Sequence, residues 1–401
     1  MRRFFEGIEQ LAIDVIMERR GGKRAALLRA ILYEASRIWR KIVETRLFLY
    51  RSYLLRQHLL GCPVISIGNL TMGGTGKTPI VEKLARELTE HGRHVAVLSR
   101  GYKSVPKPLF KRLLARLKQH QDFFAPRVVS DGGALLLDSK TAGDEPFMLA
   151  KNLKKVAVLV DRDRVKSGLY AIEHLGSDLL LLDDGFQYLK LRHRFDIVLI
   201  DREAPFGNEF LIPRGTLREP PEHLRRATHI IITKCNGSDL SLLHERIKKF
   251  NRTAEVIECA HRPVELCNMI TGEKLPLSHL KDLKIGVLSG IASPESFEQG
   301  LRKLGADLAL TQSYTDHHRY SRQEIERFLS RCRRRGLTIA ITTEKDAVRI
   351  PRLSNIEIPI YYLRIEIEIL KGKEIWDRMV KRFAGEKDDC MLHTAREALL
   401  D

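Results

Sequence analysis

The sequence predicts an α/β protein with a parallel sheet covered by helices, a second, smaller α/β domain, and an N-terminal amphipathic helical region. Three observations predict this fold. A glycine-rich turn joins an apolar strand to an amphipathic helix over residues 64–88. Apolar strands alternate with helical segments over residues 94–233, which is typical of a parallel sheet with both faces covered. The same alternation begins again after residue 236.

The central motif is VISIGNLTMGGTGKT at residues 64–78. Its glycines allow consecutive backbone N–H groups to turn inward around a polyphosphate, at a helix N-terminus that favours anions. A strand, a glycine-rich loop and a helix in this order predict a P-loop NTPase-like core. The nucleotide-binding residues are expected to be Thr71, Met72, Gly73, Gly74, Thr75, Gly76, Lys77 and Thr78.

Two residues of this motif have expected roles with ATP and Mg²⁺. Lys77 would reach the β- and γ-phosphates, and the Thr78 hydroxyl would ligate Mg²⁺. The motif departs from the usual G-x-x-x-x-G-K-[ST] because Thr71 stands six residues before the lysine, where glycine is usual. An ordinary glycine-rich turn is the alternative, but the strand before it and the amphipathic helix after it favour a nucleoside triphosphate site.

Composition limits the class of protein and its partners. The chain has 401 residues, enough for two domains, and its formal net charge of +18 predicts an anionic partner. Nucleic acid, a phosphorylated substrate and an anionic membrane surface all fit that charge. The six cysteines form no C-x-x-C pair, so we expect a reducing compartment and no zinc site. We find no cleavable signal and no apolar run long enough to span a bilayer.

Residues 1–60 are expected to form two amphipathic helices around a break at Gly21-Gly22. Basic residues line the face opposite the apolar one, as in helices that lie in a membrane interface. A packed helix with a solvated basic face is the alternative. The aromatic residues expected to contact headgroups are Phe4, Phe5, Tyr33 and Trp39.

Two polar segments interrupt the first α/β region. Residues 103–124 form a basic insertion, which is either a flap over a lipid or phosphate or a solvated surface segment. Asp144 and Glu145 stand just before a helix that is expected to begin near Phe147. Carboxylates at such a junction are candidates for catalysis or metal binding, and an N-cap aspartate is the alternative.

Strands that end in aspartate indicate the metal side of the nucleotide site. The expected strand at residues 179–182 ends in Asp183-Asp184, which is typical of a Walker B strand whose carboxylate holds Mg²⁺. Further strands are expected at residues 156–160, 196–201 and 230–233. All of them are apolar throughout, which predicts parallel pairing.

The expected domains are a region of basic amphipathic helices at 1–60, a P-loop core at 61–236, a smaller α/β domain at 237–384 and a polar tail at 385–401. A loop of the smaller domain carries His317-His318. Adjacent histidines point in different directions on most backbones, so one catalytic or substrate-binding histidine is expected rather than a metal pair.

With these motifs in order, the chain closely resembles the tetraacyldisaccharide 4′-kinases, the lipid A 4′-kinases of Gram-negative bacteria. The resemblance covers about residues 63–350. Its segments are ISIGNLTMGGTGKTP, LSRGY, AGDEP, DRDRV, DDGFQ, DIVLID, FGN…IPRGTLREP, GIASP, TDHH and TEKDAVR. The Thr71 departure is itself usual in that family.

The resemblance implies an enzyme at the cytoplasmic face of the bacterial inner membrane. It would move the γ-phosphoryl group of ATP to the 4′-hydroxyl of a tetraacylated glucosamine disaccharide 1-phosphate. Its partners would be this acylated lipid and an anionic membrane surface, with no nucleic acid, and the sequence does not fix the oligomeric state.

The resemblance also implies roles for individual residues. Asp144 would accept the proton of the 4′-hydroxyl, and His317 would orient Asp144 and tune its pKa. Lys77 and Arg164 would neutralise charge on the transferring group. The active site is expected in an interdomain cleft that closes on substrate. The implied Mg²⁺ ligands are Thr78, Asp183, Asp184 and Glu219, and the residues near substrate or phosphate are Glu145, Gln187 and Arg218.

The chain departs from the family pattern at Tyr188, where histidine is common, at Lys103, where glycine is usual, and in the long 103–124 insertion. These departures bear on substrate contacts rather than on phosphate chemistry.

Three other functions are alternatives to this one. A GTPase-like switch at a membrane would need Asn-Lys-x-Asp, which residues 233–236 do not supply. A nucleic-acid-dependent ATPase fits the charge, but the basic segments lack stacking aromatics. Another small-molecule kinase on the same fold is the nearest enzyme alternative.

Overall fold

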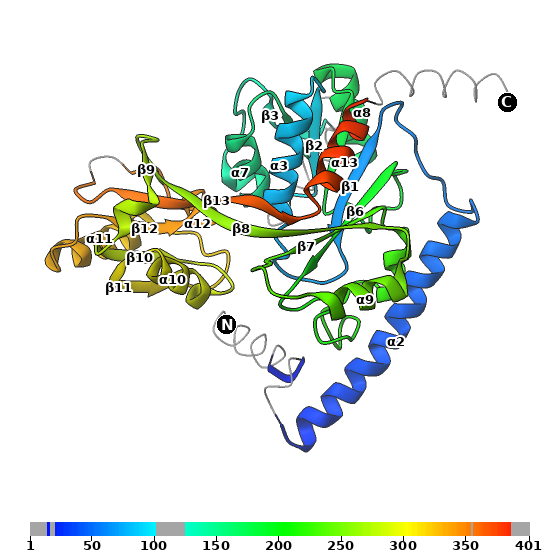
Figure 1. Cartoon of the computed structure of the whole chain (residues 1–401), viewed down its shortest axis with the longest axis horizontal. Helices are drawn as coiled ribbons and strands as arrows, with labels where there is room; N and C mark the ends of the chain where they lie inside the picture. The colour runs from blue at the N-terminus through cyan, green and yellow to red at the C-terminus, as the bar shows by residue number, and fades with distance from the viewer. Residues whose placement is uncertain (1–13, 17–20, 102–124, 354–355, 386–401) are drawn as a thin grey trace, which may run out of the picture. The chain divides into compact units, whose positions relative to one another are not determined.

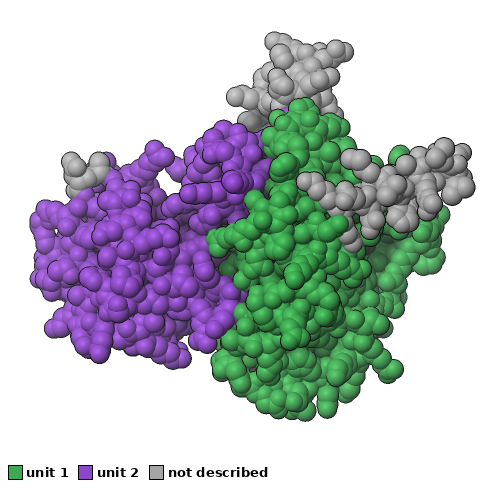
Figure 2. All heavy atoms as spheres, turned by 45° about the horizontal axis from the view of Figure 1, so that its top comes forward, with its two compact units in different colours: residues 1–100, 163–260, 369–401 green, residues 101–162, 261–368 purple. Residues whose placement is uncertain are grey.

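The computed structural model describes residues 14–16, 21–101, 125–353 and 356–385. The chain divides into two compact units, shown in different colours in Figure 2. Unit 1 comprises Met1–Arg100, Asp163–Ala260 and Ile369–Asp401, and unit 2 comprises Gly101–Arg162 and His261–Glu368. The units differ from the domains expected from the sequence, because residues 101–162 belong with the C-terminal half and residues 369–385 with the N-terminal half. Local periodicity does not encode which segments of a chain return to the same unit.

Unit 1 is built on parallel strands (Figure 1). Its sheet contains β1 (Val64–Asn69), β2 (Val95–Ser99), β5 (Leu179–Asp183), β6 (Phe195–Asp201), β7 (His229–Thr233) and the start of β8 (Glu255–Asn268). The order within the unit is β8, β7, β6, β1, β5, β2, and each of these pairs is parallel. Every residue of β1, β2, β5 and β7 is buried. The predicted parallel sheet is confirmed for this unit.

The helices of unit 1 include one that the sequence analysis missed. They are α2 (Lys23–Arg51), α3 (Lys77–Glu90), α8 (Arg164–Leu175), α9 (Ser241–Phe250), α13 (Lys373–Gly385) and the 3-10 helix η1 (Pro221–Arg226). The missed helix is α13, whose buried Trp376 donates its Nε1–H to Glu87 Oε2 of α3 at 2.6 Å. Helix α3 buries Ile80, Leu84 and Leu88 completely.

Helix α2 corresponds to the second of the two helices expected at the N-terminus. The first lies outside the described residues except for Asp14–Ile16, which are helical. Trp39 was expected to contact headgroups, and this expectation is wrong. Its ring packs against the apolar cluster that includes Leu224, and its Nε1–H donates to Arg218 O at 3.0 Å. No helix of the described ranges combines the length and apolarity needed to cross a bilayer.

Unit 2 has its own parallel strands, β10 (Lys284–Ser289), β11 (Asp307–Ser313), β12 (Ala340–Thr343) and β13 (Ile360–Lys371), in the order β11, β10, β12, β13. Two antiparallel pairs accompany them: β3 (Arg127–Asp131) with β4 (Ala157–Val160), and the end of β8 with β9 (Lys274–Pro276). Its helices are α6 (Ser139–Ala142), α7 (Asp144–Asn152), η2 (Leu277–Leu280), α10 (Pro294–Lys303), α11 (Arg322–Arg334) and α12 (Glu344–Ala347).

The expected strand at residues 156–160 is present as β4, but it pairs antiparallel with β3 and lies in unit 2. The expectation of parallel pairing is therefore wrong for this pair of strands. A short apolar run indicates a buried strand, but it carries no information about the direction of the partner strand. The basic insertion at 103–124 lies outside the described residues, as does the tail from residue 386.

Candidate active site

The phosphate loop follows β1 and ends at Gly76, which adopts the left-handed conformation with φ 77° and N-caps α3. Lys77 is therefore the first helical residue, as predicted. Gly73 also has a positive φ, 120°, although a Cβ there would meet nothing within 4 Å, so its glycine is required by backbone conformation rather than by space. The Thr75 carbonyl accepts a hydrogen bond from Thr233 Oγ1 at 2.9 Å, which ties the loop to β7.

Lys77 lies in a network of charged and polar side chains. Its Nζ donates to Asn69 Oδ1 at 3.1 Å and lies 3.4 Å from Asp184 Oδ1. Arg218 Nη1 contacts both oxygens of Asp184, at 2.9 and 2.8 Å. Burial favours a raised pKa for the Asp184 carboxyl, but the charges of Lys77 and Arg218 outweigh it and lower the pKa. Asp184 is therefore ionised at neutral pH.

Gln187 links this network to the end of β1. Its Nε2 donates to Asn69 O at 3.0 Å, and its Oε1 lies 3.4 Å from Arg218 Nη1. Gln187 and Arg218 are both expected near substrate or phosphate, and the structure brings both together with Asp184. Asn69 ends β1, Asp184 and Gln187 follow β5, and Arg218 precedes η1. These three segments therefore meet at one end of the sheet.

The predicted magnesium ligands fit that cation by their chemistry. Asp183 ends β5 directly opposite Ile67 of β1 in the parallel register, and its Oδ2 accepts from Ser99 Oγ at 3.2 Å. Thr78 is buried in the first turn of α3. Among the described residues no group of three or more His, Cys, Asp or Glu side chains is arranged to hold a metal. Mg²⁺ usually binds through one or two carboxylates together with substrate phosphates, and Asp183 is expected to supply one of these carboxylates.

Glu219 is only 4% exposed and is committed to a buried ion pair. Its Oε2 accepts from Arg226 Nη2 at 2.6 Å and lies 2.7 Å from His223 Nδ1. Burial favours a raised pKa for the Glu219 carboxyl, but the hydrogen bond of His223 and the charge of Arg226 lower the pKa overall. The role of Glu219 as a metal ligand stays a prediction.

Arg164 is buried and is positioned by Tyr188, one of the departures noted above. Its guanidinium lies over the Tyr188 ring, 4.8 Å from the centroid, and its backbone N–H donates to Tyr188 Oη at 2.9 Å. Tyr188 Oη in turn donates to Asp163 Oδ1 at 3.0 Å. The Nε of Arg164 is buried with no hydrogen-bond partner among the described residues. A buried guanidinium with an unused donor suits a phosphate ligand.

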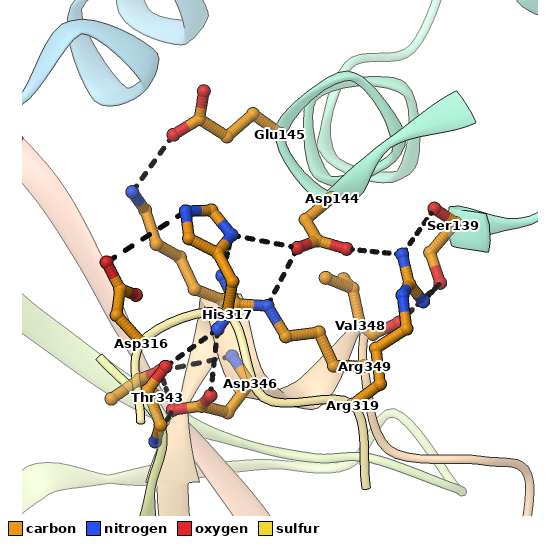
Figure 3. Close-up of polar contacts among 12 residues, drawn as sticks. Ser139, Asp144, Glu145, Asp316, His317, Arg319, Thr343, Asp346, Val348 and Arg349 are labelled. Carbon is orange, nitrogen blue, oxygen red and sulfur yellow. Dashed lines mark hydrogen bonds and ion pairs between the residues drawn. The ribbon is translucent and has the colours of Figure 1, made fainter. Parts of the chain in front are cut away.

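Asp144 is the centre of a second charged cluster, which lies within unit 2 (Figure 3). Helix α7 begins at Asp144 itself, and Gly143 with φ 94° is the N-cap, so the N-cap reading of Asp144 is wrong. The Asp144 carboxylate is 8% exposed and lies with its Oδ2 3.3 Å from His317 Nδ1. Neighbouring Glu145 lies with its Oε1 3.1 Å from Lys345 Nζ.

Two arginines that the sequence analysis did not single out complete this cluster. Arg349 Nε donates to Asp144 Oδ2 at 2.8 Å, and Arg319 Nη2 donates to Oδ1 at 2.8 Å. Burial favours a raised pKa for Asp144, but the hydrogen bond of His317 and the charges of Arg349 and Arg319 lower the pKa overall. The only signal in the sequence was position, because Arg349 ends the TEKDAVR segment and Arg319 follows TDHH.

The two adjacent histidines point in different directions, as expected. His317 has φ 63° and is directed to Asp144 (Figure 3). His318 stacks on Tyr314 with ring centroids 4.3 Å apart and meets the edge of Tyr320 at 5.0 Å. Its Nε2 lies 3.3 Å from Glu324 of the α11 capping box. His318 therefore holds the loop, and His317 is the histidine that faces the carboxylate.

Taken with the parallel sheet of unit 1, the phosphate loop and the strand ending in Asp183 define a P-loop nucleotide-binding protein. The family model for tetraacyldisaccharide-1-P 4′-kinase matches residues 28–384. The chain belongs to this family, and it is a kinase that uses ATP.

Individual relatives agree. The tetraacyldisaccharide 4′-kinase of Anaeromyxobacter dehalogenans (strain 2CP-C) is 38% identical over 361 residues, which cover 89% of this chain and 91% of the relative. That of Geobacter metallireducens is 37% identical over 350 residues, 87% and 96% of the two chains. The crystal structure of LpxK from Aquifex aeolicus in complex with ATP matches with a TM-score of 0.69 and 29% identity, and covers 89% of this chain and 99% of that one.

The Glu219 pair predicts a pH-dependent stability. A lowered pKa means that the carboxylate stabilises the fold above its ordinary pKa of 4.5 and loses this contribution as the pH falls below it. Glu219→Gln should therefore lower the free energy of unfolding by about 1–3 kcal/mol at pH 7, with a smaller difference below pH 4.5. Urea unfolding at several pH values measures this.

Glu357→Gln is the matched control for that experiment. Glu357 pairs with Arg333, but both side chains are about two-thirds exposed, at 68% and 65%. This substitution should change the stability by less than about 0.5 kcal/mol. Equal losses for the two variants, at every pH, would contradict the assigned role of the buried pair.

Proposed function

We propose that this chain transfers the γ-phosphate of ATP to the 4′-hydroxyl of a tetraacylated glucosamine disaccharide 1-phosphate, which gives the lipid A precursor. Membership of the family supports the proposal. The observation that carries it is a buried Asp144 paired with two arginines beside His317, in a chain that also has a phosphate loop. A nucleotide switch has no need of such a carboxylate, whereas transfer to an alcohol needs an acceptor for its proton.

Unit 1 handles the nucleotide in this proposal. Lys77 is held by Asn69 and Asp184, and the β- and γ-phosphates of ATP replace Asp184 as its partner. Thr78 and Asp183 would hold Mg²⁺, with Asp184 beside them. The cation supplies neutralisation of the phosphate charge when it is bound. The unused Nε of Arg164 is available to an oxygen of the transferring group.

Unit 2 activates the acceptor. The 4′-hydroxyl gives its proton to an oxygen of Asp144 as the alcohol oxygen bonds to the γ-phosphorus and ADP leaves. Because Arg319 is one-third exposed while Arg349 is buried, Arg319 is the partner that an incoming substrate group can displace from Asp144 Oδ1. His317 keeps the other oxygen oriented.

Helix α2 supports binding to a membrane surface. Five apolar side chains on it are between 52% and 65% exposed: Leu27, Ile31, Ile38, Ile42 and Phe48. Exposed basic residues share the helix: Lys23, Arg24, Arg37, Arg40, Lys41 and Arg46. Exposed apolar and basic side chains on one helix favour insertion into an anionic interface. The family resemblance supports a location at the cytoplasmic face of the bacterial inner membrane, where the acylated substrate would also lie.

Asp144→Asn tests the proposed chemistry. The variant keeps the shape of the side chain but removes the proton acceptor, so kcat should fall by about 10²–10⁴-fold. The binding of ATP should be unchanged, because the phosphate loop belongs to unit 1. The measurement is transfer of the γ-phosphate from labelled ATP with Mg²⁺ to the tetraacyl disaccharide 1-phosphate in detergent.

Asp377→Asn, on the exposed Lys373 pair of α13, is the control and should keep full activity. A wild-type protein that hydrolyses ATP without labelling the lipid would contradict the proposed acceptor. An Asp144→Asn variant with full activity would contradict the proposed base while leaving the acceptor intact.

The surface of α2 yields a second prediction. Ile31→Glu combined with Ile38→Glu should weaken binding to vesicles that contain anionic phospholipid by at least about tenfold, because each buried isoleucine contributes about 1.5–3 kcal/mol. Cosedimentation with vesicles measures this. Leu242→Glu on α9, where leucine is 83% exposed, is the matched control and should bind as the wild type does. Equal binding by all three proteins would rule out α2 as the membrane contact.

A further inference from the structure

Arg349 is a buried cation with a partner on every side. Its side chain is only 1% exposed. Nε donates to Asp144 Oδ2 at 2.8 Å, and Nη1 donates to Gly290 O at 2.8 Å and lies 3.2 Å from Asp346 Oδ1. Nη2 lies 3.0 Å from His317 Nδ1. One guanidinium therefore contacts both members of the acceptor-activating pair.

The partners of Arg349 on the opposite side are themselves fixed. Asp346 is completely buried, and its Oδ2 accepts from Thr343 Oγ1 at 2.7 Å and from the Gly290 N–H at 3.0 Å. The Gly290 N–H and C=O thus bond to Asp346 and Arg349 respectively. This arrangement attaches the guanidinium to the ends of β10 and β12, which are paired strands of the unit 2 sheet. Such support gives a side chain a single position.

Arg319 shows what a different environment does to the same contact. It also bonds to Asp144, at 2.8 Å, but its side chain is 36% exposed and its other bonds are to Ser139. Solvent or an anionic substrate group can replace Asp144 as the partner of Arg319. Arg349 is closed to solvent, so its contact with Asp144 is not open to such an exchange.

We propose that Arg349 is a positioning residue for the reaction, which holds the Asp144 carboxylate charged and the His317 ring in place through one buried guanidinium. His317 Nδ1 has a partner in either protonation state, because it accepts from Arg349 when bare and donates to Asp144 when protonated. The inference rests on the proposed role of Asp144 as the proton acceptor.

The proposal predicts a change in the pH profile. The charge of Arg349 lowers the pKa of Asp144, so its removal should raise that pKa. Because Asp144 accepts a proton only when ionised, the acidic limb of kcat/KM should then move to higher pH. Among the described residues, the charged or titratable side chains that contact Asp144 are Arg319, Arg349 and His317, and beyond them lie Asp346, Asp316 and the Glu145–Lys345 pair.

The experiment compares Arg349→Gln, Arg349→Lys, Asp144→Asn and the double variant Asp144→Asn/Arg349→Gln in the full chain. Arg349→Gln should lower kcat by about 100-fold and shift the acidic limb to higher pH, with KM for ATP unchanged. Arg349→Lys keeps the charge and should keep the acidic limb of the wild type, with an intermediate kcat. The double variant should have the same kcat as Asp144→Asn alone, because both substitutions act on one group.

Several outcomes would overturn the inference. If Arg349→Gln lowered the kcat of the Asp144→Asn variant by the same factor as it lowers the kcat of the wild type, Arg349 would be a structural residue only. A wild-type kcat in Arg349→Lys would show that the fork of hydrogen bonds is not needed, and this variant decides the question if Arg349→Gln does not fold. If Asp144→Asn lost activity while Arg349→Gln kept the kcat and pH profile of the wild type, the result would contradict the role of Arg349 but not that of Asp144. Full activity in Asp144→Asn would contradict the proposed role of Asp144 as the proton acceptor as well.

The control variant for this series is Arg333→Gln. Arg333 pairs with Glu357 in the same unit, but both side chains are largely exposed, at 65% and 68%. It should retain the kcat and the pH profile of the wild type. ATP binding and thermal unfolding of each variant, measured in parallel, separate loss of positioning from loss of fold.

Discussion

A buried carboxylate stays charged only when its neighbours replace the water it has lost. Asp144 meets this condition through Arg349 and Arg319, one on each oxygen, with His317 beside them. Two local backbone features of unit 2 position the groups of this cluster. Gly143 turns the chain so that α7 begins at the aspartate, and the left-handed backbone of His317 directs its ring inward.

The network in unit 1 follows the same principle with the opposite charge at its centre. There the central group is a cation, Lys77, which contacts Asn69 and Asp184 and in the proposed function is ready to bind a phosphate. Arg218 then balances Asp184. Charges that are arranged before the substrate arrives need not reorganise during the reaction, and this is the usual way in which enzymes stabilise phosphoryl transfer. Each unit therefore carries a network of its own charged side chains, and in the proposed function each network exchanges one partner for a substrate group.

Much of unit 1 could be predicted because its signals are local. The glycines before Lys77, the apolar strand ending in Asp183 and the amphipathic stripe of α3 each occupy one short segment, and the structure has all three. Motif order also led to Asp144 and His317, which the structure brings within hydrogen-bond reach although 173 positions separate them.

The remaining features depend on long-range contacts that a local pattern does not contain. The sequence has 69 lysine and arginine residues, and no periodicity distinguishes Arg349, which is buried, from the many that are solvated. The antiparallel pairing of β4 and the return of α13 to α3 are likewise decided by tertiary packing. The environment of Trp39 is also decided by tertiary packing. One face of its amphipathic helix packs against the protein and another is exposed, and Trp39 lies on the packed face.

The central claim is that Asp144 is an ionised carboxylate at the pH of catalysis, and its own titration tests this most directly. Aspartate labelled with ¹³C at the carboxyl carbon, with the Asp144→Asn protein to assign the signal, allows the chemical shift to be followed with pH. The account predicts a midpoint below the ordinary aspartate value of 3.8, or no titration before the protein unfolds. A midpoint above that value would contradict it, because the arginines would then not be holding the charge.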